Sequence, residues 1–247
     1  MRSIGRLARA LLPLLLGWQA LVWLLTPPRY ILPGPLDVLA AAHRQGEWLL
    51  SNTLVTLSEI AIGFLAGAGA GIVTALTVVA LPRLGRLVWP IVLVLQAFPV
   101  FVLAPLLVLW FGFGLVSKVV MTALIIFFPV ASSFADGLRR IPQELLDATA
   151  LTEASMWQAF VYVRIPLAMP SLVSGLRVAA PLAPLGAVIG EWVGASAGLG
   201  FVMVQANARM QTDIVFAAMA IVAILTLLLR AAVDMAAPAL VPWSREQ

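Results

Sequence analysis

Apolar residues are gathered along this chain into long runs that alternate with short polar stretches. Six runs are long enough, or nearly so, to cross about 30 Å of hydrocarbon as helices. They cover approximately 9–26, 59–80, 87–110, 117–135, 169–190 and 213–235. The pattern predicts an all-α integral membrane protein with six transmembrane helices, in a single transmembrane domain over residues 1–247.

The composition indicates that lipid is the main solvent of this chain. Hydrophobic residues make up 62% of the 247 residues and charged residues only 11%, whereas a soluble domain carries roughly 25% charged residues. So few charges cannot cover a surface exposed to water. The formal net charge is only +4, and the cations lie at the ends of apolar runs, so nucleic acid is not expected as a partner.

Cationic residues are divided unequally between the two ends of the predicted spans. With the N-terminus in the cytoplasm, ten arginines face that side and four cationic residues face the opposite side. The ten are Arg2, Arg6, Arg9, Arg83, Arg86, Arg139, Arg140, Arg164, Arg230 and Arg245, and the four are Arg29, Arg44, Lys118 and Arg209. This asymmetry follows the positive-inside rule, so both termini are predicted to be cytoplasmic.

Residue types that carry catalysis or bind metals are scarce. The chain has no cysteine and one histidine, which excludes disulfides, iron–sulfur clusters and cysteine-based zinc sites. No phosphate-binding loop, metalloprotease motif or nucleophile elbow occurs in the sequence. We therefore predict a transport protein rather than an enzyme, with no catalytic residue, no metal site and no cofactor of its own.

Acidic residues fall near the ends of the predicted spans. The positions concerned are Glu59, Asp136, Glu191, Asp213 and Asp234. A carrier coupled to protons or sodium ions usually has ionisable groups in the middle of the membrane. We therefore expect span centres without charge and an energy source on another polypeptide; a stand-alone secondary carrier is the alternative from another class.

The second predicted span contains closely spaced glycines. Gly63 and Gly67, and likewise Gly67 and Gly71, have the small-xxx-small spacing that lets another helix approach closely. Packing against a helix of the same chain is preferred over a specific dimer motif, because this spacing is common in apolar segments.

Two connections between the spans are unusually long. The segment 27–58 is predicted to contain a helix outside the membrane. The segment 136–168 is the most polar part of the chain, and it reads as two short helices joined by a turn. The first begins after Pro142 and has Glu144 where the helix dipole favours an acid. The acids Glu144, Asp147 and Glu153 dominate the middle of this segment, which disfavours the alternative of an amphipathic helix on anionic lipid.

The second short helix is predicted from a capping-box spacing. Ser155 is followed three residues later by Gln158, and Pro166 and Pro170 are predicted to stop the helix before the fifth span. The apolar stripe of this helix consists of Trp157, Phe160 and Val161.

The segment resembles the EAA loop of ATP-binding-cassette (ABC) importer permeases, which is the docking element for the ATPase. Asp147-Ala148-Thr149 matches the acidic-Ala-Ala start of that loop, and Ile165-Pro166 matches its closing pair. Thr149 replaces an alanine of the family, and Glu153 replaces its glycine. Because a glycine permits a positive φ in the turn, Glu153 leaves the geometry of this turn open.

Further motifs extend the resemblance over most of the chain. They are similar to those of permeases for sulfonates, taurine, nitrate and thiamine-pyrimidine precursors. The matching motifs are Ile31-Leu32-Pro33-Gly34-Pro35, Phe98-Pro99 through Pro105, Trp110-Phe111-Gly112-Phe113-Gly114, and Gly190-Glu191-Trp192-Val193-Gly194 through Gly198-Leu199-Gly200. The resemblance implies a type I ABC importer permease in a bacterial inner (plasma) membrane, with a cytoplasmic coupling helix.

The resemblance also implies partners for the chain. These are a cytoplasmic ATPase dimer that holds ATP and magnesium, an extracytoplasmic solute-binding protein, and a second permease copy, most simply as a homodimer in membrane lipid. The motifs around Glu191 and Asn207 look most like permeases for the hydroxymethylpyrimidine precursor of thiamine. A sulfonate, taurine or nitrate importer is the alternative.

Two sets of site residues follow from the resemblance. The residues expected to dock the ATPase are Asp147, Ala148, Thr149, Glu153, Trp157, Phe160 and Pro166. The residues expected at the outer mouth or along the solute path are Glu191, Trp192 and Asn207. Plain anchoring in the membrane interface is an equal alternative for Glu191 and Trp192.

Overall fold

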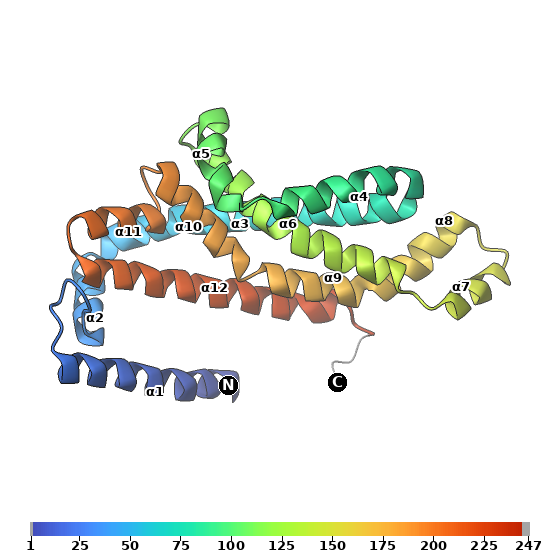
Figure 1. The fold of residues 1–247 in the computed structure, drawn as a ribbon. Coiled ribbons are helices and arrows are strands. Elements are labelled where there is room, and N and C mark those ends of the chain that lie inside the picture. The colour runs from blue at the N-terminus through green and yellow to red at the C-terminus, as the bar shows by residue number, and fades with distance from the viewer. Residues whose placement is uncertain (1, 244–247) are drawn as a thin grey trace.

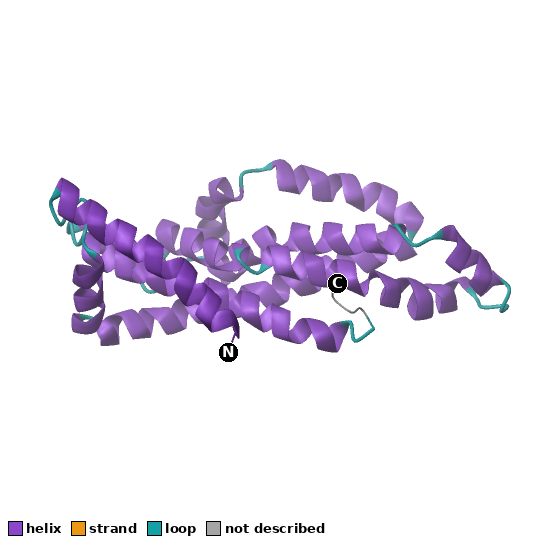
Figure 2. Cartoon of the chain, turned by 90° about the horizontal axis from the view of Figure 1, so that it is seen from below, coloured by secondary structure: helices purple, strands orange, loops and turns teal. Residues whose placement is uncertain are grey.

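The computed structural model describes residues 2–243, and within this range the chain is helical without any strand (Figure 2). The long helices lie side by side and give the molecule an elongated shape (Figure 1). These are α3 (Gly46–Ala80), α6 (Leu115–Arg139), α9 (Ile165–Ala179) and α12 (Thr212–Leu240). The predicted all-α membrane architecture is confirmed.

Four helical stretches of the described residues are long and apolar enough to cross a membrane. They are Gly46–Ala80, Leu115–Arg139, Met156–Gly194 and Thr212–Leu240. A bent pair of helices, α4 (Pro82–Ala97) and α5 (Val100–Phe111), makes a fifth if it is counted as one span. The remaining predicted span, 9–26, is the first along the chain and falls in α1 (Arg2–Leu25). The described apolar part of α1 is the shorter stretch Leu12–Leu25, so a sixth crossing stays a prediction.

The third predicted span differs from a single straight helix. Instead of running through 87–110, the chain bends by 99° between α4 and α5. Phe98 and Pro99 form the break. Proline has no N–H to donate to α4, and it disfavours a helical conformation of the residue before it, so the helix ends there.

Glycines of α3 bring this helix into close contact with α6. A Cβ atom at Gly63 would lie 2.5 Å from the Cβ of Thr122, and one at Gly67 would lie 2.6 Å from the carbonyl oxygen of Ala123. The same holds for Gly71, where the carbonyl oxygen of Phe127 would be 2.9 Å away. The prediction that this spacing packs against a helix of the same chain is confirmed.

Short helices lie at the two ends of the bundle (Figure 1). At one end are α2 (Pro35–Arg44) and α11 (Leu199–Ala208), which confirms the helix expected within 27–58. There, Arg44 pairs with Asp213 of α12 at 3.2 Å. At the other end are α7 (Gln143–Ala150) and α8 (Met156–Ala159). The two sets of predicted site residues therefore lie at opposite ends of the molecule.

Candidate functional site: a projecting turn and a cavity at the opposite end

The segment expected to dock an ATPase forms two short helices and a turn, as predicted. α7 begins after Pro142, and α8 is capped by Ser155. The Ser155 hydroxyl accepts from the Gln158 backbone N–H at 3.2 Å, and the Ser155 backbone N–H donates to Oε1 of Gln158 at 2.8 Å. This reciprocal pair of hydrogen bonds satisfies two backbone N–H groups that the helix start leaves free. It therefore fixes the point at which the turn ends and α8 begins.

Neither Pro166 nor Pro170 stops the second helix, contrary to the prediction, because both lie within α9. α8 continues through a π-helical turn, η1 (Phe160–Arg164), directly into α9. The Ile165 N–H donates to the carbonyl of Phe160, five residues earlier. The wider turn accommodates the proline ring, which would clash with the carbonyl four residues before it in a regular helix. A helical path thus connects the docking segment with the spans.

Large apolar side chains project from this turn. Leu151, Met156 and Trp157 are 87%, 91% and 66% exposed. Trp157 stacks on the buried ring of Phe160, with 5.7 Å between ring centroids. A hollow of about 540 Å³ lies between the turn and the end of α3, and Met156, Trp157 and Phe160 contribute to its lining. An exposed apolar group on a polar segment is typical of a protein contact surface.

The other predicted docking residues occupy different depths of this segment. Asp147 and Ala148 are exposed on α7, whereas Thr149 is half-buried and its hydroxyl donates to the carbonyl of Leu146 at 2.7 Å. Pro166 is half-buried in α9. The apolar stripe predicted for the second helix is divided, because Phe160 points inward and Trp157 outward.

Glu153 adopts the left-handed conformation itself, with a φ of 57°. The turn therefore has the positive φ that the glycine of the family would permit, although an L side chain stands there. For a residue with a Cβ this conformation costs roughly 1–2 kcal/mol. The turn keeps its shape at the expense of local strain.

Replacing Glu153 by glycine is expected to raise the free energy of unfolding by about 0.5–1 kcal/mol. The relief of strain exceeds the roughly 0.5–1 kcal/mol that glycine loses through its freedom in the unfolded chain. Glu153→Ala is the matched control, because it removes the carboxylate and keeps the strained backbone. Thermal unfolding in detergent measures both variants, and an equal gain for alanine would assign the effect to charge instead.

At the opposite end of the bundle, Trp192 and Asn207 line one cavity of about 580 Å³. Its walls come from α10 (Leu182–Gly194), α11 and α12. Most of the lining side chains are apolar, including Leu185, Val188 and Met219, and the Asn207 amide is one of its few polar groups. The cavity is therefore open and largely apolar.

Glu191 is not part of this cavity, although the sequence placed it at the outer mouth. Its side chain is only 2% exposed. One carboxylate oxygen accepts from the Thr56 hydroxyl of α3 at 2.6 Å, and the other accepts from the backbone N–H of Gly200. Glu191 therefore fastens the start of α11 to α3 and α10, and it positions the helix that carries Asn207.

Asn52 and Thr56 complete the attachment of α11. The N–H of Gly198 donates to Oδ1 of Asn52 at 2.7 Å, and the N–H of Leu199 donates to the Thr56 hydroxyl oxygen at 2.8 Å. Three successive N–H groups, which a helix start leaves without intrahelical partners, are thus satisfied by buried side chains.

The glycines around Glu191 make room for this carboxylate. Gly198 has a φ of 108°, and a Cβ atom there would lie 2.2 Å from Oε1 of Glu191. A Cβ atom at Gly200 would lie 2.8 Å from Oε2. The spacing of Glu191 and the two glycines in the sequence is therefore explained by their contact.

Buried charge is more extensive than the sequence indicated. Because α3 begins at Gly46, Glu59 lies well inside a helix and is buried, which contradicts the expectation that it marks a span end. Lys118 is buried too, and its ammonium group donates to the carbonyls of Phe113, Gly114 (3.0 Å) and Gly194 (2.8 Å). Among the described residues, no three His, Asp or Glu side chains could hold a metal ion together.

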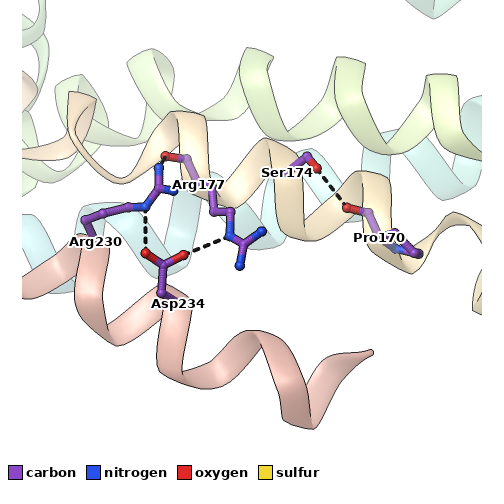
Figure 3. A network of polar contacts seen from close by, with 5 residues as sticks. All are labelled: Pro170, Ser174, Arg177, Arg230 and Asp234. Atoms are coloured by element: carbon purple, nitrogen blue, oxygen red, sulfur yellow. Dashed lines mark hydrogen bonds and ion pairs between the residues drawn. The ribbon is translucent and has the colours of Figure 1, made fainter. Parts of the chain in front are cut away.

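A second polar network joins α9 to α12 (Figure 3). Asp234 accepts from Nε of Arg177 at 2.8 Å and from Nε of Arg230 at 3.0 Å, and Arg230 also donates to the Arg177 carbonyl at 2.8 Å. Two arginines thus share one carboxylate between the helices. The network links the span that follows the docking segment to the last helix.

Together, these features describe a helical membrane protein with a projecting apolar turn at one end and a cavity at the other. Residues 67–246 match the family described as the binding-protein-dependent transport system inner membrane component. The chain belongs to this family, and it is the permease subunit of an ABC importer.

Several relatives match nearly the whole chain. A probable ABC transporter permease protein of Haemophilus influenzae is 45% identical over 90% of both chains. The formylaminopyrimidine transport permease protein ThiX of Halalkalibacterium halodurans is 34% identical over 96% of this chain and 94% of its own. The riboflavin transport system permease protein RibX of Chloroflexus aurantiacus is 37% identical over 94% of this chain and 88% of its own.

A solved structure supports the fold. An inward-facing structure of the MetNI methionine ABC transporter aligns with a TM-score of 0.66, at 22% identity, over 82% of this chain and 99% of the matched chain. This likeness confirms the type I importer permease architecture.

Proposed function

We propose that this chain docks cytoplasmic ATPase subunits through the turn around Leu151, Met156 and Trp157. The observation that carries the proposal is the projection of these apolar side chains from a polar segment at one end of the bundle. Membership in the ABC importer permease family supports an ATPase as the occupant. A second permease copy and an external solute-binding protein complete the proposed assembly.

In the proposed cycle, closure of the ATPases on ATP draws the two docking turns together. The helical stretch from Met156 to Gly194 contains 39 residues, or roughly 58 Å at 1.5 Å per residue. It connects the docking surface to Trp192 at the outer cavity. Because the stretch is broken between α9 and α10, movement of α9 relative to α10 would open one end of the bundle while it closes the other.

We propose a neutral nitrogen heterocycle of the pyrimidine type as the solute. Two relatives that match nearly the whole chain are named for formylaminopyrimidine and for riboflavin. The apolar outer cavity, with Trp192 and the Asn207 amide, suits a flat heterocycle with hydrogen-bonding edges. Lys118 does not favour an anion, because its ammonium group is occupied by three carbonyls. A sulfonate, taurine or nitrate is the alternative solute.

Charge reversal at Asp147 tests the docking. In Asp147→Arg, ATPase co-purification and ATP-driven uptake of labelled hydroxymethylpyrimidine into proteoliposomes with the binding protein are expected to fall about tenfold or more. Across an interface, charge juxtaposition of the wrong sign costs several kcal/mol. Glu47→Arg, the same reversal at an exposed position at the opposite end, is the matched control.

Unchanged ATPase capture and uptake in Asp147→Arg would show that docking occurs elsewhere. Uptake that persists without any ATPase would identify a secondary carrier. If ATP-driven uptake accepts taurine or another sulfonate and rejects the pyrimidine, the importer class holds and the proposed solute is replaced.

A further inference from the structure

The bend between α4 and α5 exposes a continuous piece of backbone. All seven residues from Leu93 to Pro99 are exposed, including the polar side chain of Gln96. α4 follows the half of the bundle nearer α7 and α8, and α5 leaves it sideways beside the middle of the long helices (Figure 1). We call the residues Leu93–Pro99 the elbow.

Backbone polar groups of the elbow lack partners within their own helices. The last four carbonyls of α4, at 94–97, are free at the helix end, and so are the first N–H groups of α5. Among the described residues, the elbow has a single backbone hydrogen bond outside the regular helices: the N–H of Val102 donates to the carbonyl of Pro99. Within residues 2–243, the Gln96 amide forms no side-chain hydrogen bond either.

Another break in the chain shows how this protein satisfies irregular backbone elsewhere. Between α9 and α10, Ala179 and Ala180 are fully buried. The N–H of Ala180 donates to the carbonyl of Leu176 at 2.9 Å, and its carbonyl accepts from the N–H of Ala183 at 3.3 Å. The alanines of that break are buried and its backbone is hydrogen-bonded, although Pro181 is exposed. The elbow, in contrast, is exposed at every residue.

Lipid cannot take the place of these missing partners. An unsatisfied backbone group in hydrocarbon costs several kcal/mol, so non-helical backbone at membrane depth occurs only inside protein or beside water. Several consecutive carbonyls and a primary amide are satisfied most simply by water, since a dry protein surface would have to match each group separately.

We propose that the elbow lines a water-filled solute path, where the Gln96 amide hydrogen-bonds the passing solute. This inference rests on the proposed transport function and deepens it. A primary amide both donates and accepts, so it complements the donor and acceptor edge of a neutral heterocycle rather than an anion.

The absence of cysteine from the natural sequence allows a direct test. In Gln96→Cys, the new thiol is the sole one, and a charged, membrane-impermeant maleimide reaches it only through water. Labelling is measured in sealed proteoliposomes and in inverted vesicles. Leu65→Cys, at an exposed apolar position on α3, is the control that we expect to face lipid, and Asn207→Cys, exposed at the α11 end of the bundle, is the accessible control. Ala97→Cys repeats the test at a second elbow position.

Labelling of Gln96→Cys and Ala97→Cys, at least about tenfold faster than Leu65→Cys, is the expected result. Rates as slow as those of Leu65→Cys would place the elbow in lipid or in a dry contact and would overturn the proposal. A disulfide between two copies of Gln96→Cys without labelling would also overturn it, by identifying a second copy as the cover.

Transport variants test the role of the Gln96 side chain. Uptake is expected to fall about fivefold to tenfold in Gln96→Leu, the effect of one lost hydrogen bond, and to be largely kept in Gln96→Asn. Equal uptake by Gln96→Leu and wild type would remove Gln96 from the path. Labelling requires no ATPase, so a labelled elbow in a chain that fails to transport separates this inference from the proposed function.

Discussion

Trp157→Ala is expected to weaken the binding of the ATPase subunit about 30-fold or more, while the permease keeps its fold. Exposed aromatic side chains at protein interfaces often contribute about 2 kcal/mol or more to affinity. Trp157 has this character, because it is two-thirds exposed and held in place by the Phe160 ring. The affinity is measured by titration of the purified ATPase against permease in nanodiscs.

Tyr162→Ala is the matched control for this variant. Tyr162 is an exposed aromatic residue at 76% and lies in the π-helical turn, outside the projecting apolar group. Its replacement is expected to change the affinity by less than about threefold, as at most interface or rim positions. If both variants lose binding equally, the docking surface extends along η1; if neither does, Trp157 has another role.

Glu191→Ala is expected to lower the free energy of unfolding by about 4 kcal/mol. The substitution leaves the buried Gly200 N–H without its acceptor, and it leaves the Thr56 hydroxyl only the long bond to the Asn52 carbonyl at 3.3 Å; a lost partner of a buried group costs about 1–3 kcal/mol. It also opens a cavity beside Gly198. In a chain of this length the melting temperature should fall by about 10 °C, since 1 kcal/mol corresponds to roughly 2–4 °C.

Two further variants make this prediction specific. Glu191→Gln keeps one acceptor oxygen and is expected to lose about half as much stability as the alanine variant. Trp192→Ala alters the neighbouring side chain, which is half-exposed, and should lose less than about 1 kcal/mol. A Glu191→Ala protein as stable as Trp192→Ala would mean that the attachment of α11 does not depend on this carboxylate.

Local patterns were sufficient to predict much of this fold. The apolar runs indicated the long helices, because in lipid every backbone N–H and C=O group must be hydrogen-bonded within the protein, as it is in a helix. Ser155 and Gln158 marked the start of α8, since a capping box is made within four residues. The placement of the two sets of predicted site residues at opposite ends of the bundle also followed from local signals.

Features that depend on contacts between distant segments were not predicted. Thr56 and Glu191 are separated by 135 positions, so no local pattern indicates that they meet. Glu59 appeared to lie at a span end because the apolar run begins there, whereas tertiary packing extends α3 back to Gly46. The signal that could have exposed the attachment of α11 was the pair of glycines at 198 and 200, read together with the acid before them.

The contact between Glu191 and Gly198 links the evolution of two positions seven residues apart. Because the carboxylate fills the space that a Cβ at 198 would occupy, a mutation at either position alone is penalised. Only paired changes avoid the clash, such as a shorter acid at 191 together with alanine at 198. Even then, the φ of 108° at 198 is unfavourable for any residue with a Cβ atom. Homologous permeases should therefore inherit these two positions together or exchange them together.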